Sequence, residues 1–291
     1  METLSSAQLA QLGRLHIRMK KKSITMSEGT RRSTSKGRSA EFSGYREYIP
    51  GDDMRYVDWN AYGRLDKLYI KEYTEEREGR VNIFLDTSIS MNFGEKLKST
   101  LMAELAQSLA YIALNDRDSV YVTDLAHVER RFRLPRGRQG MSRMQSFLEG
   151  LTMEGSIDIT EAITKAAIGG SGVTFIISDF MDENFLSKQE ECLRYLDFCH
   201  QNVVLLHVLS DEELHVEDVG AYQLIDSENE SLEVRLNLDK KVIESYDKAL
   251  KTYIDNLGST ADRCKAHYIL CSTGDSFDKI IYEDMRVVYD I

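Results

Sequence analysis

One carboxylate and two hydroxyl groups follow directly after a strongly apolar run in the first third of the chain. The run spans residues 81–85, and Asp86, Ser88 and Ser90 come next. A second apolar run, later in the chain, is followed at once by Ser178 and Asp179. Carboxylate and hydroxyl oxygens are the ligands that hard divalent cations prefer in proteins. Asp86, Ser88, Ser90 and Asp179 therefore predict a site for Mg²⁺, or for Mn²⁺ or Ca²⁺.

This set of ligands favours binding over catalysis. Neutral hydroxyls leave a divalent cation short of negative charge, so an open coordination position can accept a carboxylate from another protein. A metal-dependent hydrolase would need a positioned base beside the ion, and no histidine closely follows either segment. We expect a protein-interaction site and not an enzyme, with a hydrolase as the third interpretation. The same residues could instead only cap backbone N–H groups at a strand-to-helix turn.

The elements that must position these residues are predicted by the apolar pattern. Nearly continuous apolar runs indicate buried strands, and helical periodicity lies between them. This alternation is typical of a doubly wound, mostly parallel α/β sheet of Rossmann type, in which ligands bind at the carboxyl ends of the strands. The predicted strands are 81–86, 119–124, 129–134, 173–178, 203–209 and 267–271, with helices at 95–114, 138–150, 159–168, 184–200 and 240–264 and a hairpin at 222–236.

Residues 1–79 are predicted to form a helical and extended annex to a sheet domain at 80–291. An amphipathic helix is expected within residues 4–20, and a basic, exposed segment follows it up to residue 39. An alternating strand at 68–74 is expected to join the sheet through a hairpin turn. The annex would therefore lead directly into the first buried strand.

Three polar or aromatic features are assigned structural roles. Asp52 and Asp53 follow a Pro-Gly turn signal, where aspartates usually bond local backbone N–H groups. Trp59, the only tryptophan, is expected to pack against neighbouring residues. His207 lies inside an apolar strand, and the chain has no Gly-x-Ser-x-Gly motif, so we expect a core histidine and not part of a catalytic triad.

Length and composition limit the class of protein further. The 291 residues are 42% hydrophobic, which is enough for one large α/β domain with a smaller annex. No apolar run approaches the roughly 20 residues that cross a bilayer, and no secretory signal is evident, so a cytoplasmic protein is expected. The four cysteines lack the spacing of a zinc site and are expected to be reduced thiols: Cys192, Cys199, Cys264 and Cys271.

Two stretches of the sequence resemble known families. Residues 85–91 (LDTSISM) are similar to the Asp-x-Ser-x-Ser motif of von Willebrand factor A domains, and Ser178-Asp179 resembles their later metal-site aspartate. This implies a von Willebrand factor A-like fold with a metal-ion-dependent adhesion-like site. Residues 47–59 (EYIPGDDMRYVDW) and 64–71 (RLDKLYIK) are similar to the bacterial family called domain of unknown function 58. That resemblance implies an adaptor for a MoxR-type AAA+ ATPase.

One position departs from the pattern of the metal site. The usual Gly-Gly-Thr-Asp segment is Gly155-Ser156-Ile157-Asp158 here, so Ile157 replaces the threonine that would support the metal. Ser156 and Asp158 are the candidates to compensate for it. Because loss of a supporting ligand costs about 10–100-fold in metal affinity, we expect the site to be partly degenerate.

The basic N-terminal segment supports the alternative function, which is binding of nucleic acid or of an acidic partner. The chain has a formal net charge of −11, yet residues 14–38 are rich in Lys and Arg. Clustered basic residues gain affinity by releasing counterions from phosphates. Residues 18–40 contain no aromatic side chain for base stacking, and the acidic remainder of the chain offers an intramolecular partner. We therefore favour the protein-interaction hypothesis.

Overall fold

The computed structural model describes six stretches of the chain, which form two compact units. The larger unit contains residues 4–18 and the described residues from 79 onward, and the smaller unit contains residues 40–75. The basic segment predicted at 20–39 lies outside the described residues. The described residues are 4–18, 40–75, 79–216, 220–225, 233–238 and 240–290.

A six-stranded sheet forms the centre of the larger unit as the structure describes it. Its strands follow one another through parallel pairing, except that β6 is antiparallel to β5. The predicted mostly parallel α/β architecture is therefore confirmed. In spatial order the strands are β11 (His267–Ser272), β8 (Gln201–Leu209), β7 (Gly172–Ser178), β4 (Arg80–Leu85), β5 (Ser119–Asp124) and β6 (Phe132–Arg133).

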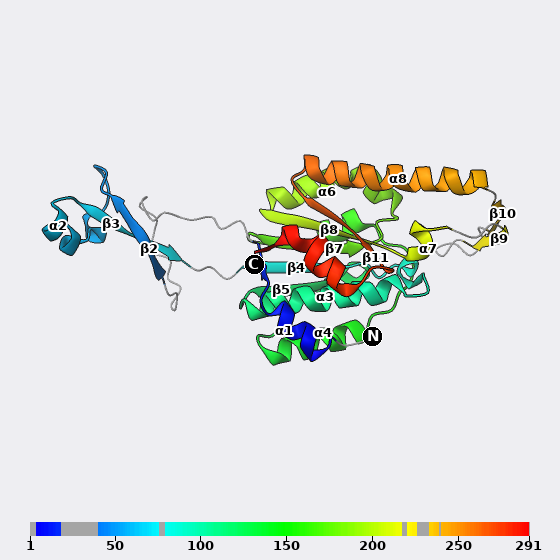
Figure 1. The fold of residues 1–291 in the computed structure, drawn as a ribbon, viewed down its shortest axis with the longest axis horizontal. Helices are drawn as coiled ribbons and strands as arrows, with labels where there is room; N and C mark the ends of the chain where they lie inside the picture. Colours follow the sequence, from blue (N-terminus) through cyan, green and yellow to red (C-terminus); the bar gives the residue numbers. More distant parts are fainter. Residues whose placement is uncertain are drawn as a thin grey trace. The chain divides into compact units, whose positions relative to one another are not determined.

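Helices cover both faces of this sheet (Figure 1). Each face has its own cluster of buried apolar residues, as a doubly wound sheet requires. One face carries α1 (Ser6–Leu12), α3 (Lys98–Asn115) and α4 (Arg138–Glu149), and the other carries α5 (Ile159–Lys165), α6 (Glu183–Phe198) and α8 (Lys240–Arg263).

Shorter elements connect these layers. The predicted hairpin at 222–236 is confirmed by the antiparallel pair β9 and β10. The predicted strand at 129–134 is mostly wrong: only its last part forms a strand, β6, because a 3₁₀ helix extends to Arg130. The Asp124 carboxylate starts that helix by accepting a hydrogen bond from Ala126 N. The shorter elements of the larger unit are η2 (Ile89–Asn92), η3 (Leu125–Arg130), α7 (Asp211–Leu214), β9 (Gly220–Ile225), β10 (Glu233–Leu238), the π-helix η4 (Lys279–Glu283) and η5 (Asp284–Val288).

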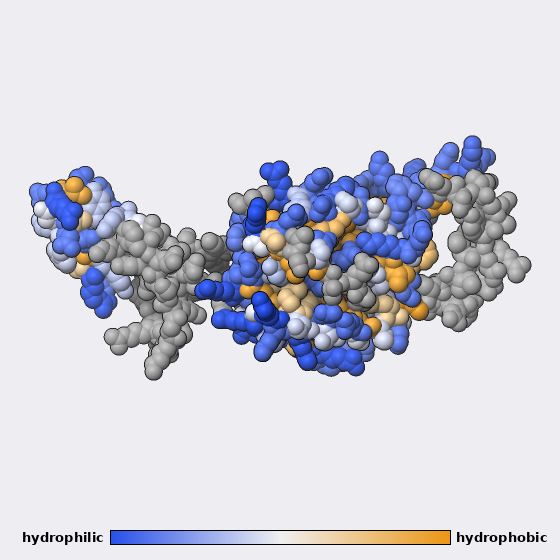
Figure 2. Space-filling view, turned by 60° about the horizontal axis from the view of Figure 1, so that its bottom comes forward, coloured by the Kyte–Doolittle hydropathy of each residue, from blue (hydrophilic) through white to orange (hydrophobic). Residues whose placement is uncertain are grey.

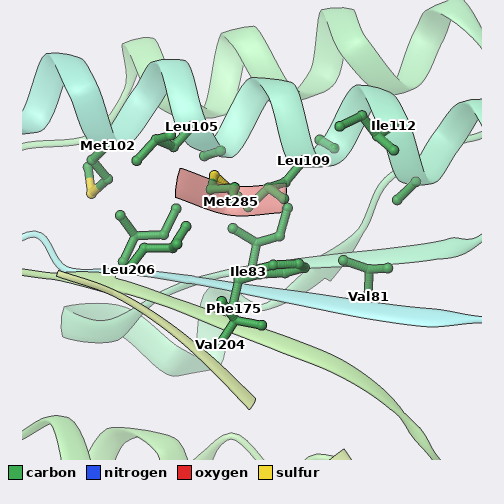
Figure 3. Packing of buried hydrophobic residues seen from close by; sticks show 14 of the residues in the cluster. Val81, Ile83, Met102, Leu105, Leu109, Ile112, Phe175, Val204, Leu206 and Met285 are labelled. Atoms are coloured by element: carbon green, nitrogen blue, oxygen red, sulfur yellow. The ribbon is translucent and has the colours of Figure 1, made fainter. Parts of the chain in front are cut away.

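The helix α3 packs lengthwise on the centre of the sheet. Leu105 and Leu109 face Ile83 of β4 and Phe175 of β7 in the close-up of this core (Figure 3). These four side chains are fully buried. Strands β4 and β7 are buried on both faces, which explains why their sequences are continuous apolar runs.

The two units divide close to the predicted boundary at residue 79, but the N-terminal helix belongs to the larger unit and not to the annex. Ser5 and the side chain of Gln8 form a capping box at the start of α1. Leu12 and Leu15 then bury their side chains in the cluster around α3. Strand β1 (His16–Ile17) pairs with β12 (Tyr289–Asp290), which ties this segment to the other end of the chain.

The smaller unit has its own pair of antiparallel strands, β2 (Ala40–Glu47) and β3 (Tyr69–Glu75). The predicted strand at 68–74 therefore exists, but the prediction that it joins the main sheet is wrong: its partner is β2. Trp59 packs against its neighbour Tyr62 edge-to-face, although 57% of Trp59 is exposed. This unit also contains η1 (Met54–Tyr56) and α2 (Trp59–Leu65).

The turn before η1 behaves as the sequence predicts. The Asp52 carboxylate accepts a hydrogen bond from Ile49 N at 2.9 Å, and Asp53 accepts one from Arg55 N at 3.0 Å. Arg46 also forms a two-pronged ion pair with Asp52 at 2.6 and 2.7 Å. Both aspartates are thus engaged in local structure.

Two expectations about chemistry and environment concern the chain as a whole. Cys192, Cys199, Cys264 and Cys271 are all free thiols, and Cys192 and Cys271 are buried. Within the ranges that the structure describes, every helix is too short or too polar to span a bilayer.

Leu12→Ala tests whether α1 is an integral part of the sheet unit. Leu12 is fully buried against α3, so its truncation is expected to lower the free energy of unfolding by about 2–5 kcal/mol. Urea unfolding followed by circular dichroism measures the change. Arg14→Ala, at an exposed position two residues later, is the control and should stay within about 0.5 kcal/mol of the wild type. A loss below about 1 kcal/mol for Leu12→Ala would contradict the assignment.

Candidate functional site

The two predicted carboxylates lie at the carboxyl edge of neighbouring strands. Asp86 follows β4 directly and Asp179 follows β7, and Asp86 N donates to Ile177 O at 3.0 Å. Both side chains are nearly inaccessible, with relative exposures of 3% and 2%. The parallel register of β4 and β7 thus brings together two segments that are 93 positions apart in the sequence.

Asp86, Ser88 and Ser90 form a continuous cluster of oxygen atoms. Ser88 N donates to Asp86 Oδ1 at 2.9 Å, and the Ser88 hydroxyl also bonds the Asp86 carboxylate. The hydroxyls of Ser88 and Ser90 are 3.0 Å apart. Ser178 donates its hydroxyl to Asp86 Oδ2. Asp86 and Ser88 are buried whereas Ser90 is partly exposed, so the cluster reaches from the sheet edge to the surface.

The local charge around Asp86 is negative. Burial and, to a smaller extent, the nearby charge of Asp179 raise the pKa of the Asp86 carboxyl to about 6, against the hydrogen bonds from Ser178 and Ser88. The ionised form of Asp86 is therefore costly at neutral pH. A cation beside this carboxylate would remove much of that cost.

Asp179 already has a cationic partner inside the protein. Its Oδ2 lies 2.8 Å from Nζ of Lys98, and the same Nζ lies 2.8 Å from Oε1 of Glu213. Lys98 is 1% exposed. Burial by itself would lower the pKa of Lys98, but the charges of Asp179 and Glu213 outweigh this effect and hold the pKa above its usual value. Lys98 therefore stays charged and pairs with one of the two carboxylates that the sequence assigned to the metal.

The chain turns sharply after Asp179. Phe180 has a φ of 52°, a left-handed conformation that costs a bulky residue about 1–3 kcal/mol. Two hydrogen bonds hold it: Phe180 N donates to Ser178 Oγ at 2.8 Å, and the Tyr253 hydroxyl donates to Phe180 O. The ring of Phe180 stacks on that of Phe185 in the core. Backbone strain of this kind clusters at functional sites.

The loop before α5 lies against the Asp86 segment through its backbone. Ile89 N donates to Gly155 O and Glu154 N donates to Thr87 O, both at 3.0 Å. The loop thus brings Ser156, Ile157 and Asp158 close to this edge of the sheet.

The side chains of this loop contribute unequally to the site. Ser156 is exposed, and Asp158 caps α5 by accepting from Glu161 N at 2.8 Å. Ile157 packs against the apolar cluster under α5 and α6. Asp158 is therefore engaged as a helix cap, and Ile157 anchors the loop by apolar contact where the resembling motif has a hydroxyl.

Sequence reasoning missed a second group of side chains at the same edge. Asp124, at the end of β5, accepts from the Thr87 hydroxyl at 2.5 Å and bonds Nδ1 of His127 at 3.0 Å. Thr87 and Asp124 are buried, and His127 is 43% exposed. The signal that identifies Asp86 and Asp179, an aspartate after a buried strand, is also present at Asp124.

His207 occupies the core position that its sequence context predicts. It is fully buried, its Nδ1 lies 2.6 Å from the Tyr268 hydroxyl, and burial lowers its pKa to about 4. The rings of Phe180, Tyr253 and Tyr268 meet it edge-on. A neutral histidine in an aromatic cage has a packing role behind Asp179.

The donor set fits a hard cation in part. Among the described residues, no three His, Cys, Asp or Glu side chains gather into a metal-binding group. Asp86 with Ser88 and Ser90 offers one carboxylate and two hydroxyls, which are ligands of the kind that Mg²⁺ accepts. Asp179 can act only through a shared position with Lys98. The donor set therefore matches a hard cation only in part, through one carboxylate and two hydroxyls.

Lys98→Met tests whether the buried ion pair holds this edge together. The variant leaves Asp179 buried without its cation, which is expected to cost about 3–5 kcal/mol at neutral pH. Adding Asp179→Asn to it should recover most of the loss, because the uncompensated charge is gone. The exposed Lys96→Met is the control, with an expected cost of at most about 1 kcal/mol. Equal stability of the two single variants in urea unfolding would rule out a structural role for Lys98.

Asp86→Asn is expected to stabilise the metal-free protein at neutral pH but not in acid. The carboxyl has its ordinary pKa of 3.8 when unfolded and about 6 when folded. As the pH rises between these values the unfolded chain loses the proton first, so the wild type loses up to about 3 kcal/mol of stability by pH 7. Asparagine avoids this loss. Urea unfolding in EDTA near pH 4 and near pH 7 measures the difference.

Ser88→Ala is the matched control for this titration, because it removes a neighbouring hydroxyl without changing charge. It should keep the loss of stability between pH 4 and pH 7 or enlarge it, because the Ser88 hydroxyl lowers the pKa of Asp86 and is then missing. Asp118, whose pKa burial also raises to about 6, is unchanged in all three proteins and cancels in the comparison. A gain for Asp86→Asn that is the same at both pH values would contradict the raised pKa.

Comparison with known proteins identifies a family and leaves the chemistry open. Uncharacterized proteins from Mycobacterium bovis and from two strains of Mycobacterium tuberculosis are each 23% identical to this chain over 267 residues, covering 88% of this chain and 82% of theirs. The family model described as protein of unknown function DUF58 matches residues 44–253, a range that contains β3, the Asp86 cluster, Lys98 and Asp179. The chain belongs to the DUF58 family.

Proposed function

We propose that this protein is a non-enzymatic interaction module that binds a partner protein at the Asp86 edge of its sheet. The observation that carries the proposal is the cluster of Asp86, Ser88 and Ser90 oxygens beside Asp179. The cluster lies at the carboxyl edge of a doubly wound sheet, where ligands of this architecture bind. It is negatively charged, buried at its base and open at Ser90.

The proposal includes a weakly bound divalent cation, Mg²⁺ in the first place. Asp86, Ser88 and Ser90 would hold it, and Asp179 would act through the charge that it shares with Lys98. When bound, the cation would supply a positive charge with an open coordination position for an acidic side chain of the partner. The raised pKa of Asp86 supports the proposal, because a cation would relieve the unfavourable burial of that charge.

The von Willebrand factor A-like identity of the domain and its partner class are parts of the same proposal. The motif at residues 85–91 supports the first, together with its position after the central strand β4. The likeness of residues 47–59 and 64–71 to the family supports the second, in which the protein acts as an adaptor for a MoxR-type AAA+ ATPase. Residues 40–75 form a separate compact unit, and we assign to it a share in the choice of partner.

The chemistry of the buried groups favours binding over turnover. Lys98 is held in two ion pairs, and His207 is neutral and enclosed by aromatic rings. Neither is free to move a proton at the Asp86 cluster. His127 is bound to Asp124, whose other oxygen accepts from Thr87. Thr87 is fully buried, so it is not accessible as a nucleophile.

Capture of a partner tests the proposal. Immobilised protein incubated with an extract of the source cells in Mg²⁺ is expected to retain an AAA+ ATPase. Retention should be lost in EDTA and with Asp86→Asn, because both remove the charge pairing at the cluster. Mass spectrometry of the eluate, compared across the three conditions, is the measurement. Capture of the same ATPase in EDTA or by Asp86→Asn would refute the proposed site.

Asp118→Asn is the matched control for partner capture. Asp118 is also a buried aspartate whose pKa is raised to about 6, but it lies before β5 and accepts from Gly79 N, at the opposite edge of the sheet. Its neutralisation should leave capture unchanged.

Mg²⁺ should also raise the unfolding midpoint of the wild type and of Asp118→Asn, and not that of Asp86→Asn, since only a protein that binds the ion is stabilised by it.

A further inference from the structure

A groove of about 820 Å³ lies on the helical face of the larger unit, away from the Asp86 edge. It is bordered by α1 and by Leu4, which lies two residues before that helix. The other borders are α3 and α4, with the loop that precedes α4. Lys98, at the first turn of α3, belongs to the Asp86 edge, whereas the groove follows the last turns of the same helix. Since 18 residues of helix span about 27 Å, the two surfaces are well separated.

The groove follows two parallel stripes of helical residues. Gln107, Tyr111 and Leu114 of α3 have the spacing i, i+4 and i+7, and Arg138, Met141 and Gln145 of α4 have i, i+3 and i+7. Each stripe therefore runs for about two helical turns. Figure 2 turns the side of the unit that carries α1 and α4 toward the viewer, and hydrophobic surface is exposed there among hydrophilic side chains.

The charge of the groove is opposite to that of the whole protein. The chain has a net charge of −11, yet the described residues that line the groove include Arg117, Arg136 and Arg138 and no Asp or Glu. Arg117 and Arg138 are exposed, and neither has an ion pair with any other described residue. The groove is thus apolar along its base and positively charged at its border.

Arg117 occupies a backbone position that usually belongs to glycine. Its φ is 62°, and it follows the last residues of α3, where helices commonly end in the left-handed conformation. A side chain other than glycine or asparagine there costs about 1 kcal/mol. Glycine would end the helix at a lower conformational cost. The presence of arginine is therefore better explained by the charge that it places at the border of the groove.

The lining distinguishes between occupants. The chain's own segment at 20–39 is basic and would be repelled by Arg117 and Arg138. A single acyl chain requires continuous apolar walls, but Gln107 and Gln145 interrupt them, together with two further polar side chains of the lining. Amide groups between apolar side chains instead suit an amphipathic helix of another protein, whose surface offers both apolar side chains and hydrogen-bonding groups.

We propose that this groove binds an acidic amphipathic helix of a partner protein. The apolar face of that helix packs on Tyr111, Leu114 and Met141, and its flanking carboxylates pair with Arg117 and Arg138. Two turns of contact on each bordering helix accommodate about two turns of the partner. This surface is independent of the Asp86 edge and of any cation.

Selection from a peptide library tests the proposal. Displayed peptides of about 18 residues, a length that forms a stable helix on binding, are selected against the full-length protein. The enriched peptides are expected to be acidic, with apolar residues at helical spacing. Their affinity, measured by fluorescence anisotropy, should fall at least about tenfold for the Arg117→Glu/Arg138→Glu variant, and should fall with rising salt.

The matched control is Lys188→Glu/Lys251→Glu, which changes the net charge equally at two exposed positions on α6 and α8, over the other face of the sheet. This variant should bind the selected peptides within about twofold of the wild type, which separates a local effect of the groove from general repulsion. Circular dichroism confirms that both variants are folded. Because all four positions are exposed, neither substitution disturbs the core.

Three results would overturn the proposal. The first is the absence of enriched peptides, or enrichment of peptides that bind the Arg117→Glu/Arg138→Glu variant equally well. The second is competition by sodium dodecanoate without any acidic peptide binding, which would make the occupant a single-chain lipid. The third is concentration-dependent dimerisation in analytical ultracentrifugation that Arg117→Glu/Arg138→Glu abolishes, which would make the occupant a second copy of the chain.

Discussion

The ion pair between Lys98 and Asp179 is the interaction on which the candidate site depends. Both side chains are almost completely buried, so neither charge can be solvated by water. Glu213 completes the group at 2.8 Å from the ammonium. Lys98 also stands in the first turn of α3, where the helix dipole disfavours a cation. Only the two carboxylates make that position tolerable, and so they fix the start of α3 against the ends of β7 and β8.

This internal cation changes how the edge can treat a divalent ion. Asp86, Asp179 and Glu213 carry three negative charges against one on Lys98, so the region stays negative. Burial and the charge of Asp179 keep the pKa of Asp86 raised. A second cation is therefore favoured electrostatically, but it must share Asp179 with Lys98. Lys98 thus holds this edge together without a metal ion, and the proposed cation would depend on the negative charge that remains at Asp86. Replacement of a supporting hydroxyl by Ile157 shifts the balance between the two cations toward the internal one.

The sequence predicted the position of Asp86 and Asp179 because both depend on local patterns. A strand buried on both faces has no polar alternation, so β4 and β7 are visible as apolar runs, and the residues after them must lie at one edge if the strands are parallel. Lys98 gave no such signal, since a lysine near the start of an amphipathic helix usually faces water. Its partner Glu213 is 115 positions away, and only the tertiary fold brings them together.

The pairing of β3 could not be predicted for a related reason. Alternation of polar and apolar residues identifies a half-buried strand but not its partner, and the nearest strand in the sequence, β4, was the natural choice. The actual partner β2 contains a glycine and a bulge and has little apolar character of its own. The sequence predicted that Trp59 packs against neighbouring residues, but not that more than half of it stays exposed.

The helix α3 is common to both proposed surfaces, and its packing determines how they relate. Most of its residues are buried against the sheet, so it cannot bend or shift locally without breaking core contacts. Its first turn holds Lys98 at the Asp86 edge, and its last turns form the base of the arginine-bordered groove. Two partners can therefore bind at the same time on opposite ends of one rigid element.

Coupling between them would require two arrangements of α3 with different affinities, and the dense packing around Leu105 and Leu109 opposes a second arrangement. Under the two proposals, the protein would therefore join two partners at a fixed separation and would not transmit a signal between them.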